Sequence, residues 1–178
     1  MRSCGSSSKF SSCVPAVDYF NPDGDTGKPL VCIKQVYESH HSGGILRLQG
    51  PEEARAILPE AICLLFAGAL LNMTYSFMDR QENLLGSPPF SVPKVRFVHS
   101  MVAIVHGDKD KAFLIEEYIS APFSKYVNNS KPAPVQGLEG PTLELAHFLC
   151  FAQHVQYEKS PKLAYTSDFQ GTFNIFLC

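Results

Sequence analysis

The chain has 178 residues, of which 45% are hydrophobic and 18% charged, and its formal net charge is −2. This length and composition suit one compact domain with its own core. The near-neutral charge offers no basic surface, so we expect no nucleic-acid or membrane partner. The polar first thirteen residues lack the apolar segment of an export signal. The apolar run at 61–71 is shorter than the ~20 residues of a membrane span, so we expect a cytoplasmic protein with reduced thiols.

The N-terminal part is predicted to be irregular and then to enter a strand. Residues 1–28 are rich in Ser, Gly, Pro and Asp, and the domain proper is expected to occupy residues 29–178. Alternation over residues 29–37 predicts a strand with Lys34 near its centre. Residues 39–50 are expected to be a loop.

A helical pattern begins at Pro51, which suits a first helical position. Pro59 is expected to restart the helix, because proline cannot donate a hydrogen bond in a helix interior. Residues 60–77 are apolar on most faces, which predicts a largely buried helix.

Four more elements are expected in the rest of the chain. They are strands at 95–106, 111–119 and 163–169, the first of them one strand or a short pair, and a helix at 142–159. This order predicts an α+β domain in which a mainly antiparallel sheet precedes a helical part.

Lys34 is the first candidate for chemistry, because it has apolar neighbours on both sides and an unpaired ammonium is costly to bury. It either points to solvent from an edge strand or contacts nucleotide phosphates, as a strand lysine does in protein kinases. Glu60 opens the apolar helix. It is either the acid that pairs with Lys34 or a carboxylate that complements the positive helix end.

Two carboxylates, Glu116 and Glu117, end an apolar strand. One of them must leave the core, because neighbouring side chains of a strand point to opposite faces. The other can accept a hydrogen bond from an exocyclic amine such as that of adenine.

Asp168 and Gln170 follow the last predicted strand and are expected to point the same way. Their oxygens suit Mg²⁺, which takes one or two protein ligands beside substrate phosphates. Gly171 would let the backbone turn sharply. The alternative is an ordinary turn after a strand.

Three side chains of types that bind zinc, His147, Cys150 and His154, are predicted at helical spacing on nearly one face. They supply three ligands where a structural site uses four, so packing against the core is the favoured interpretation.

Five segments carry a combined signal: VCIKQVY at 31–37, FLIEEYI at 113–119, FSKYVNNS at 123–130, FAQHVQYEKS at 151–160 and SDFQG at 167–171. Taken together and in order, they resemble the alpha-kinase family. That family carries a nucleotide-lysine strand, a Glu-Glu hinge, a Lys-Tyr-Asn-Asn-Asn run, a helix reading Ala-Phe-Ser-His-Phe-Thr-Tyr-Glu, and Asp-Leu-Gln-Gly or Asp-Ile-Gln-Gly. It includes myosin heavy chain kinases, the elongation-factor-2 kinase and channel kinases, and the short chain is similar to fungal members.

The resemblance implies a two-lobed, atypical protein-kinase-like α+β domain, with an antiparallel sheet in its N-lobe and a mixed C-lobe. It implies ATP and Mg²⁺ as cofactors. Lys34 would contact the phosphates with Glu60 as its partner, and Glu116 and the backbone near Tyr118 would meet adenine. By the same resemblance, Asn129 would lie near the ribose and phosphates, Asp168 and Gln170 would hold Mg²⁺ with Asp168 as the catalytic residue, and His154 would be a zinc ligand.

The sequence also departs from the family pattern. The family continues to a Thr-Asp-Pro segment with the catalytic acid/base Asp and to an HxCxxxC set of zinc ligands, neither of which precedes Cys178. We therefore expect a domain incomplete at its C-terminus, with His154 a vestigial zinc ligand. The turn at Gly24–Gly27 is too close to the strand to match the family's phosphate loop.

The implied activity is transfer of the ATP γ-phosphate to a Ser or Thr hydroxyl of a protein. Absence of a positioned acid/base group slows such a reaction by ~10²–10⁴, so weak transfer is expected. Two alternatives stay open: a nucleotide-binding pseudokinase that acts as a scaffold, and a truncated fragment without function.

Overall fold

The computed structural model describes residues 9–15, 30–39, 45–107 and 111–177. The chain divides into two compact units. The first comprises Met1–Ile62 and His99–Tyr118, and the second comprises Cys63–Val98 and Ile119–Cys178. The long helix α1 (Gly50–Leu85) contributes its first part to one unit and the rest to the other.

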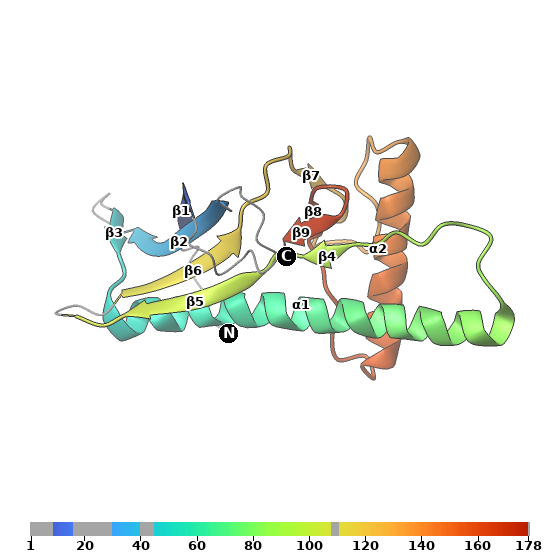
Figure 1. Ribbon diagram of the computed structural model, residues 1–178, viewed down its shortest axis with the longest axis horizontal. Coiled ribbons are helices and arrows are strands. Elements are labelled where there is room, and N and C mark those ends of the chain that lie inside the picture. Colours follow the sequence, from blue (N-terminus) through green and yellow to red (C-terminus); the bar gives the residue numbers. More distant parts are fainter. Residues whose placement is uncertain (1–8, 16–29, 40–44, 108–110, 178) are drawn as a thin grey trace. The chain divides into compact units, whose positions relative to one another are not determined.

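The first unit contains an antiparallel sheet in the order β1-β2-β6-β5, with β3 also paired to β2 (Figure 1). Its strands are β1 (Lys9–Pro15), β2 (Leu30–Ser39), β3 (Ile45–Arg47), β5 (Ser100–Val105) and β6 (Lys111–Glu117). The first part of α1 covers one face of this sheet, where Ile57 packs with Val36 of β2 and with Leu114 of β6. Strand alternation places Ala112 on the same face as Leu114.

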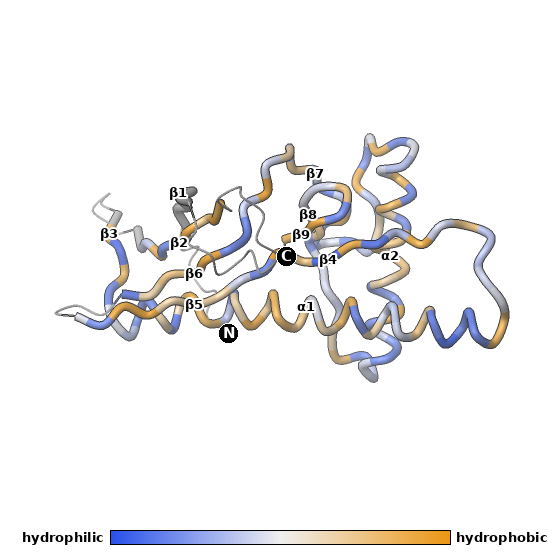
Figure 2. The backbone as a smooth tube through the Cα atoms, in the orientation of Figure 1, coloured by the Kyte–Doolittle hydropathy of each residue, from blue (hydrophilic) through white to orange (hydrophobic). Residues whose placement is uncertain are grey.

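Two expectations about α1 are wrong. Pro59 lies inside a continuous helix and does not restart it, since a proline removes one donor without ending every helix. The helix is also not largely buried. Only 22% of its most apolar 18-residue stretch is buried, and Leu65 and Phe66 are 72% and 62% exposed. By length and composition alone α1 is apolar enough to cross a membrane, as its hydrophobic middle shows (Figure 2). An apolar pattern gives the composition of a helix, but it does not indicate whether other residues cover that helix.

The second unit combines a small mixed sheet with the helix α2 (Gly140–Lys159). The sheet order is β4-β9-β8-β7, in which β4 and β9 run parallel and the other pairs antiparallel. Its strands are β4 (Arg96–Phe97), β7 (Ser124–Lys125), β8 (Gln170–Gly171) and β9 (Ile175–Leu177). The predicted α+β class, with one antiparallel and one mixed sheet, is confirmed.

An aromatic core holds this small sheet together. Phe169 and Phe176 are fully buried, with ring centroids 5.9 Å apart in an edge-to-face contact. The ring centroid of Phe97 lies 6.0 Å from that of Phe169, and the ring centroid of Tyr126 lies 5.4 Å from that of Phe176. Such pairs add ~0.5–1.5 kcal/mol to the area that they bury. Phe169 therefore anchors the segment that carries both predicted magnesium ligands.

Local predictions succeed where the pattern is long and regular. The strands near 29–37 and 111–119 and the helix near 142–159 are confirmed, and residues 95–106 form a short pair of strands. The expected strand at 163–169 is wrong, because pairing begins only at Gln170. A strand also occurs within each of the segments 1–28 and 39–50. Both pair with β2, and such pairing leaves little local signal.

Candidate functional site

Lys34 lies between two carboxylates in the first unit. Its Nζ is 2.8 Å from Glu116 Oε2 on β6 and 3.4 Å from Glu60 Oε1 on α1. Because β2 has partner strands on both edges, Lys34 is not on an edge strand and that alternative is wrong. The side chain is only 21% exposed, so the two carboxylates offset the cost of burying its charge.

Glu116 has one oxygen paired and one unpaired. Its side chain is almost fully buried, and Oε1 has no hydrogen-bond partner among the described residues. A buried acceptor without a donor costs ~1–3 kcal/mol. The neighbouring Glu117 is the carboxylate that leaves the core, as alternation predicts. Glu116 Oε1 can therefore accept a hydrogen bond from a donor group of a ligand.

The Tyr118 backbone is partly used by the fold. Its N–H donates to the Leu30 carbonyl over 3.2 Å, which ties the end of β6 to the start of β2. A ligand contact at Tyr118 would therefore come from its carbonyl oxygen.

Asp168 lies in the second unit, with its backbone in the left-handed region (φ 60°). Its Oδ1 forms an ion pair with Lys125 Nζ. Lys125 is brought there by β7, which pairs with Gln170 of β8. Sequence reasoning missed Lys125, although it lies inside the segment 123–130 that carries part of the resemblance. Asn129 accepts a hydrogen bond from Ser167 over 3.3 Å, so it adjoins the same segment.

Gly171 is required for a different reason from the one expected. Its φ is not positive, and the left-handed residue of the turn is Asp168. A Cβ at position 171 would clash with the Ile175 carbonyl oxygen and would lie 2.8 Å from Phe176 Cα. Glycine therefore permits the close approach of β9 to β8.

The zinc-capable side chains of α2 do not form a described site. His147 and His154 are exposed, and Cys150 is half-buried with its thiol pKa raised by burial. The part of the chain that the structure describes holds no group of three His, Cys, Asp or Glu side chains suited to a metal. Zinc thus has no support in these residues.

A second buried charge pair was also missed. Glu53 is fully buried and accepts two hydrogen bonds from Arg47, at 2.8 and 3.2 Å. It also accepts the backbone N–H of Ala112. The pair fastens α1 to β3 and β6 and has no evident role in ligand binding.

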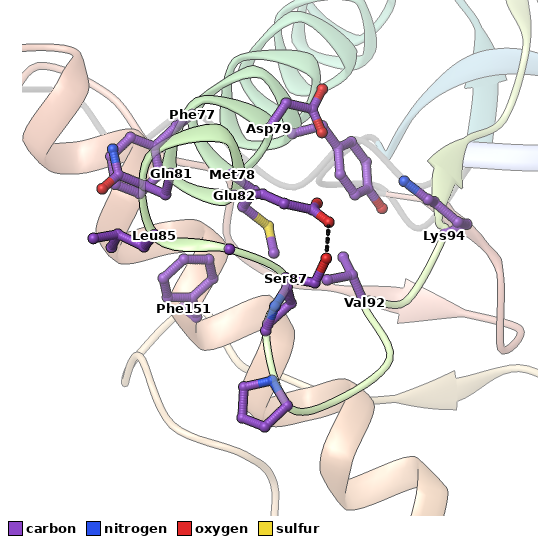
Figure 3. Close-up of a pocket in the computed structure, with 14 residues that line it drawn as sticks. Phe77, Met78, Asp79, Gln81, Glu82, Leu85, Ser87, Val92, Lys94 and Phe151 are labelled. Carbon is purple, nitrogen blue, oxygen red and sulfur yellow. Dashed lines mark hydrogen bonds between the residues drawn. The ribbon is translucent and has the colours of Figure 1, made fainter.

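The second unit contains a cavity of about 440 Å³ that none of the predicted site residues lines. Its walls are mostly apolar, and two of the residues that line it, Ser87 and Glu82, are joined by a hydrogen bond that the Ser87 hydroxyl donates (Figure 3). Its charged lining residues are Asp79, Glu82 and Lys94, and the Lys94 ammonium lies 5.1 Å from the centroid of the Tyr75 ring. Because no residue predicted to contact ATP lines this cavity, it is not the candidate nucleotide site.

The predicted site residues therefore fall into two groups. Lys34, Glu60, Glu116 and Tyr118 belong to the first unit, and Asn129, His154, Asp168 and Gln170 belong to the second. Comparison with known families gives a match to the alpha-kinase family over residues 60–178, which is two-thirds of the chain. The chain belongs to the alpha-kinase family. It is thus a member of a family of atypical protein kinases, and the match includes every predicted site residue except Lys34. None of the curated proteins compared with it matches this alpha-kinase chain.

Proposed function

We propose that this alpha-kinase chain transfers the γ-phosphate of ATP to a Ser or Thr hydroxyl of a protein. The observation that carries the proposal is the Lys34 ammonium, held between Glu60 and Glu116 in a largely buried setting. Kinases use such a strand lysine and helix glutamate to bind nucleotide phosphates. The proposed partner is therefore a protein substrate, and a cytoplasmic location stays a prediction.

The two oxygens of Glu116 suit two separate tasks. Oε2 pairs with Lys34, which orients the ammonium, whereas Oε1 is buried and meets no hydrogen-bond donor among the residues that the structure describes. The exocyclic amine of adenine would supply that donor. Binding of the nucleotide would then remove an existing cost in addition to adding a contact.

The segment that contains Asp168 suits a cation. The Asp168 carboxylate already pairs with the Lys125 ammonium, and Gln170 adds an amide oxygen two positions further on. Mg²⁺, with two protein oxygens and the nucleotide phosphates, would neutralise the charge that develops during transfer.

A phosphate-transfer assay tests the proposal. Purified chain is incubated with radiolabelled ATP, Mg²⁺ and casein, and phosphoserine and phosphothreonine are counted. Lys34→Ala should lower incorporation by about 10²-fold or more, since it removes a charge that stabilises the transition state. The matched control is Lys131→Ala at an exposed position, which should stay within about twofold. Equal incorporation by the wild type and Lys34→Ala would refute the proposal.

Nucleotide binding without transfer is a second candidate, because the Lys34 cluster is complete within the first unit. A thermal shift separates the two. If ATP raises Tm in the wild type but not in Lys34→Ala, and no phosphate is transferred, the chain binds nucleotide without kinase activity. ATP at a concentration of 100 times its Kd raises the free energy of unfolding by ~2.7 kcal/mol.

A further inference from the structure

Two buried glutamines of α2 hold the backbone immediately before Asp168. The Gln153 side chain donates from Nε2 to the Thr166 carbonyl over 2.8 Å. The Gln156 side chain accepts the Thr166 N–H at Oε1, also over 2.8 Å. Both main-chain groups of Thr166 are therefore bound by a helix where the sequence predicted a strand.

The segment after Thr166 is fixed residue by residue. Ser167 donates to the Asn129 side chain, and Asp168 pairs with Lys125. The Phe169 carbonyl accepts the N–H of Tyr126, and its ring lies in the aromatic core. Thr166 is the first of these anchors on the N-terminal side, two residues before the left-handed Asp168.

The two glutamines supply what an apolar side chain cannot. Each uses one amide atom to satisfy a main-chain group of Thr166, whereas Gln153 Oε1 and Gln156 Nε2 are buried without a hydrogen-bond partner among the described residues. An apolar side chain would remove that unpaired amide atom but would leave the Thr166 carbonyl or N–H without its partner, at a comparable desolvation cost. The specific contribution of the glutamines is therefore to hold the Thr166 backbone in place.

We propose that Gln153 and Gln156 are positioning residues that set the backbone at Thr166. Through that backbone they hold Asp168 in its left-handed conformation, with its carboxylate directed toward the Mg²⁺ that it would bind. This inference rests on the proposed function for its metal-binding part. The placement of the 166–168 backbone by the two amides stands on the hydrogen bonds themselves.

Four variants test the inference. Gln153→Met and Gln156→Met each remove one bond at nearly constant side-chain volume. Gln156→Glu keeps an oxygen acceptor for the Thr166 N–H and serves as the conservative rescue. Val155→Ala is the control, because Val155 is buried on the same helix and has no polar group. All measurements are made well below each variant's Tm.

The first readout is amide hydrogen exchange of residues 166–170 by NMR. Exchange in Gln156→Met should be faster by roughly tenfold or more, whereas Val155→Ala with a comparable loss of Tm should leave it near wild type. Gln156→Glu should recover part of the protection. Unchanged exchange in both Met variants would overturn the inference, whatever the chain does with nucleotide.

The second readout is the Kd for a non-hydrolysable ATP analogue, measured by calorimetry with and without Mg²⁺. The wild type should bind roughly tenfold more tightly with Mg²⁺, and both Met variants should lose most of that gain with the metal-free Kd kept within about twofold. If the Met variants keep the gain, the positioning role is wrong. If the wild type shows no gain, the proposed metal function of Asp168 fails, and the exchange data alone decide whether the glutamines set the backbone.

Discussion

Replacing Gly171 by alanine tests the close approach between β8 and β9. Gly171 is a central residue of the small sheet, opposite Ser124 on one side and Phe176 on the other. An added Cβ would overlap the Ile175 carbonyl oxygen and would lie 2.8 Å from Phe176 Cα and 3.0 Å from the Ile175 carbonyl carbon. All three are backbone atoms, so no side-chain rotation relieves the clash.

The cost can be worked from these contacts. Carbon atoms rest at about 3.5–4.0 Å from one another, so β9 must retreat by about 1 Å. That movement strains the bond from Thr172 N–H to the Ile175 carbonyl, 2.9 Å long, and shifts the fully buried Phe176. Overpacking costs ~1–3 kcal/mol and a lost hydrogen bond ~1 kcal/mol. For a chain of this size each kcal/mol lowers Tm by ~2–4 °C, so we expect a fall of about 4–16 °C.

Thermal unfolding followed by circular dichroism measures the effect. The matched control is Gly68→Ala in α1, where an added Cβ meets nothing within 4 Å. Alanine is favoured over glycine in a helix by ~1 kcal/mol, so this control should raise Tm by about 2–4 °C. A Gly171→Ala protein that melts within about 1 °C of the wild type, or above it, would show that the approach of β9 is not tight.

Two further substitutions and one alkylation experiment test other buried groups. Arg47→Met removes the two hydrogen bonds that Arg47 donates to the buried Glu53 carboxylate and leaves the Ala112 N–H as its donor, which should cost ~3–5 kcal/mol in urea unfolding. A loss below ~1 kcal/mol would contradict a buried pair. Tyr75→Phe removes a hydroxyl that bonds the Pro93 carbonyl and both main-chain groups of Val95, and it should cost ~1–3 kcal/mol. Burial raises the pKa of Tyr75 above 10.0, so its stabilisation is complete below pH 10.0 and is lost as pH rises through the folded pKa; the Phe variant should lose less stability than the wild type in alkaline melts. Burial also raises the pKa of the Cys150 thiol, so iodoacetamide at pH 8.5 should alkylate the exposed Cys63 before Cys150. Mass spectrometry measures the order, and alkylation of Cys150 before Cys63 would refute this.

The lysine cluster was accessible to sequence reasoning because its signals are local. A lysine in an apolar strand and a glutamate at the start of an apolar run each indicate a charge that needs a partner, and Lys34 and Glu60 do form an ion pair. The closer partner, Glu116, depends on the register of β2 with β6, in which Cys32 lies opposite Glu116. Register is set by pairing across the sheet, so the sequence identified Glu116 as a polar group without identifying its partner.

The residues around Asp168 were harder to predict, because their partners come from other elements. Residues 163–169 look like a strand in the sequence, yet Thr166 is bound by side chains of α2 and not by a neighbouring strand. Lys125 reaches Asp168 through pairing of two short strands. Strands of two residues carry too little periodicity to be read from a sequence.

Each of the four residues at 168–171 meets a separate structural or chemical requirement. Asp168 takes a left-handed backbone and carries charge, and Phe169 fills the aromatic core. Gln170 continues the ladder with β7 and β9, and Gly171 leaves room for the β9 backbone. Two of these requirements concern packing and would exist without any ligand. A match to the family's Asp-x-Gln-Gly run is thus partly a signature of how the small sheet closes. Chemistry has to be tested at Asp168 and Gln170, whose side chains the closure of the sheet does not require.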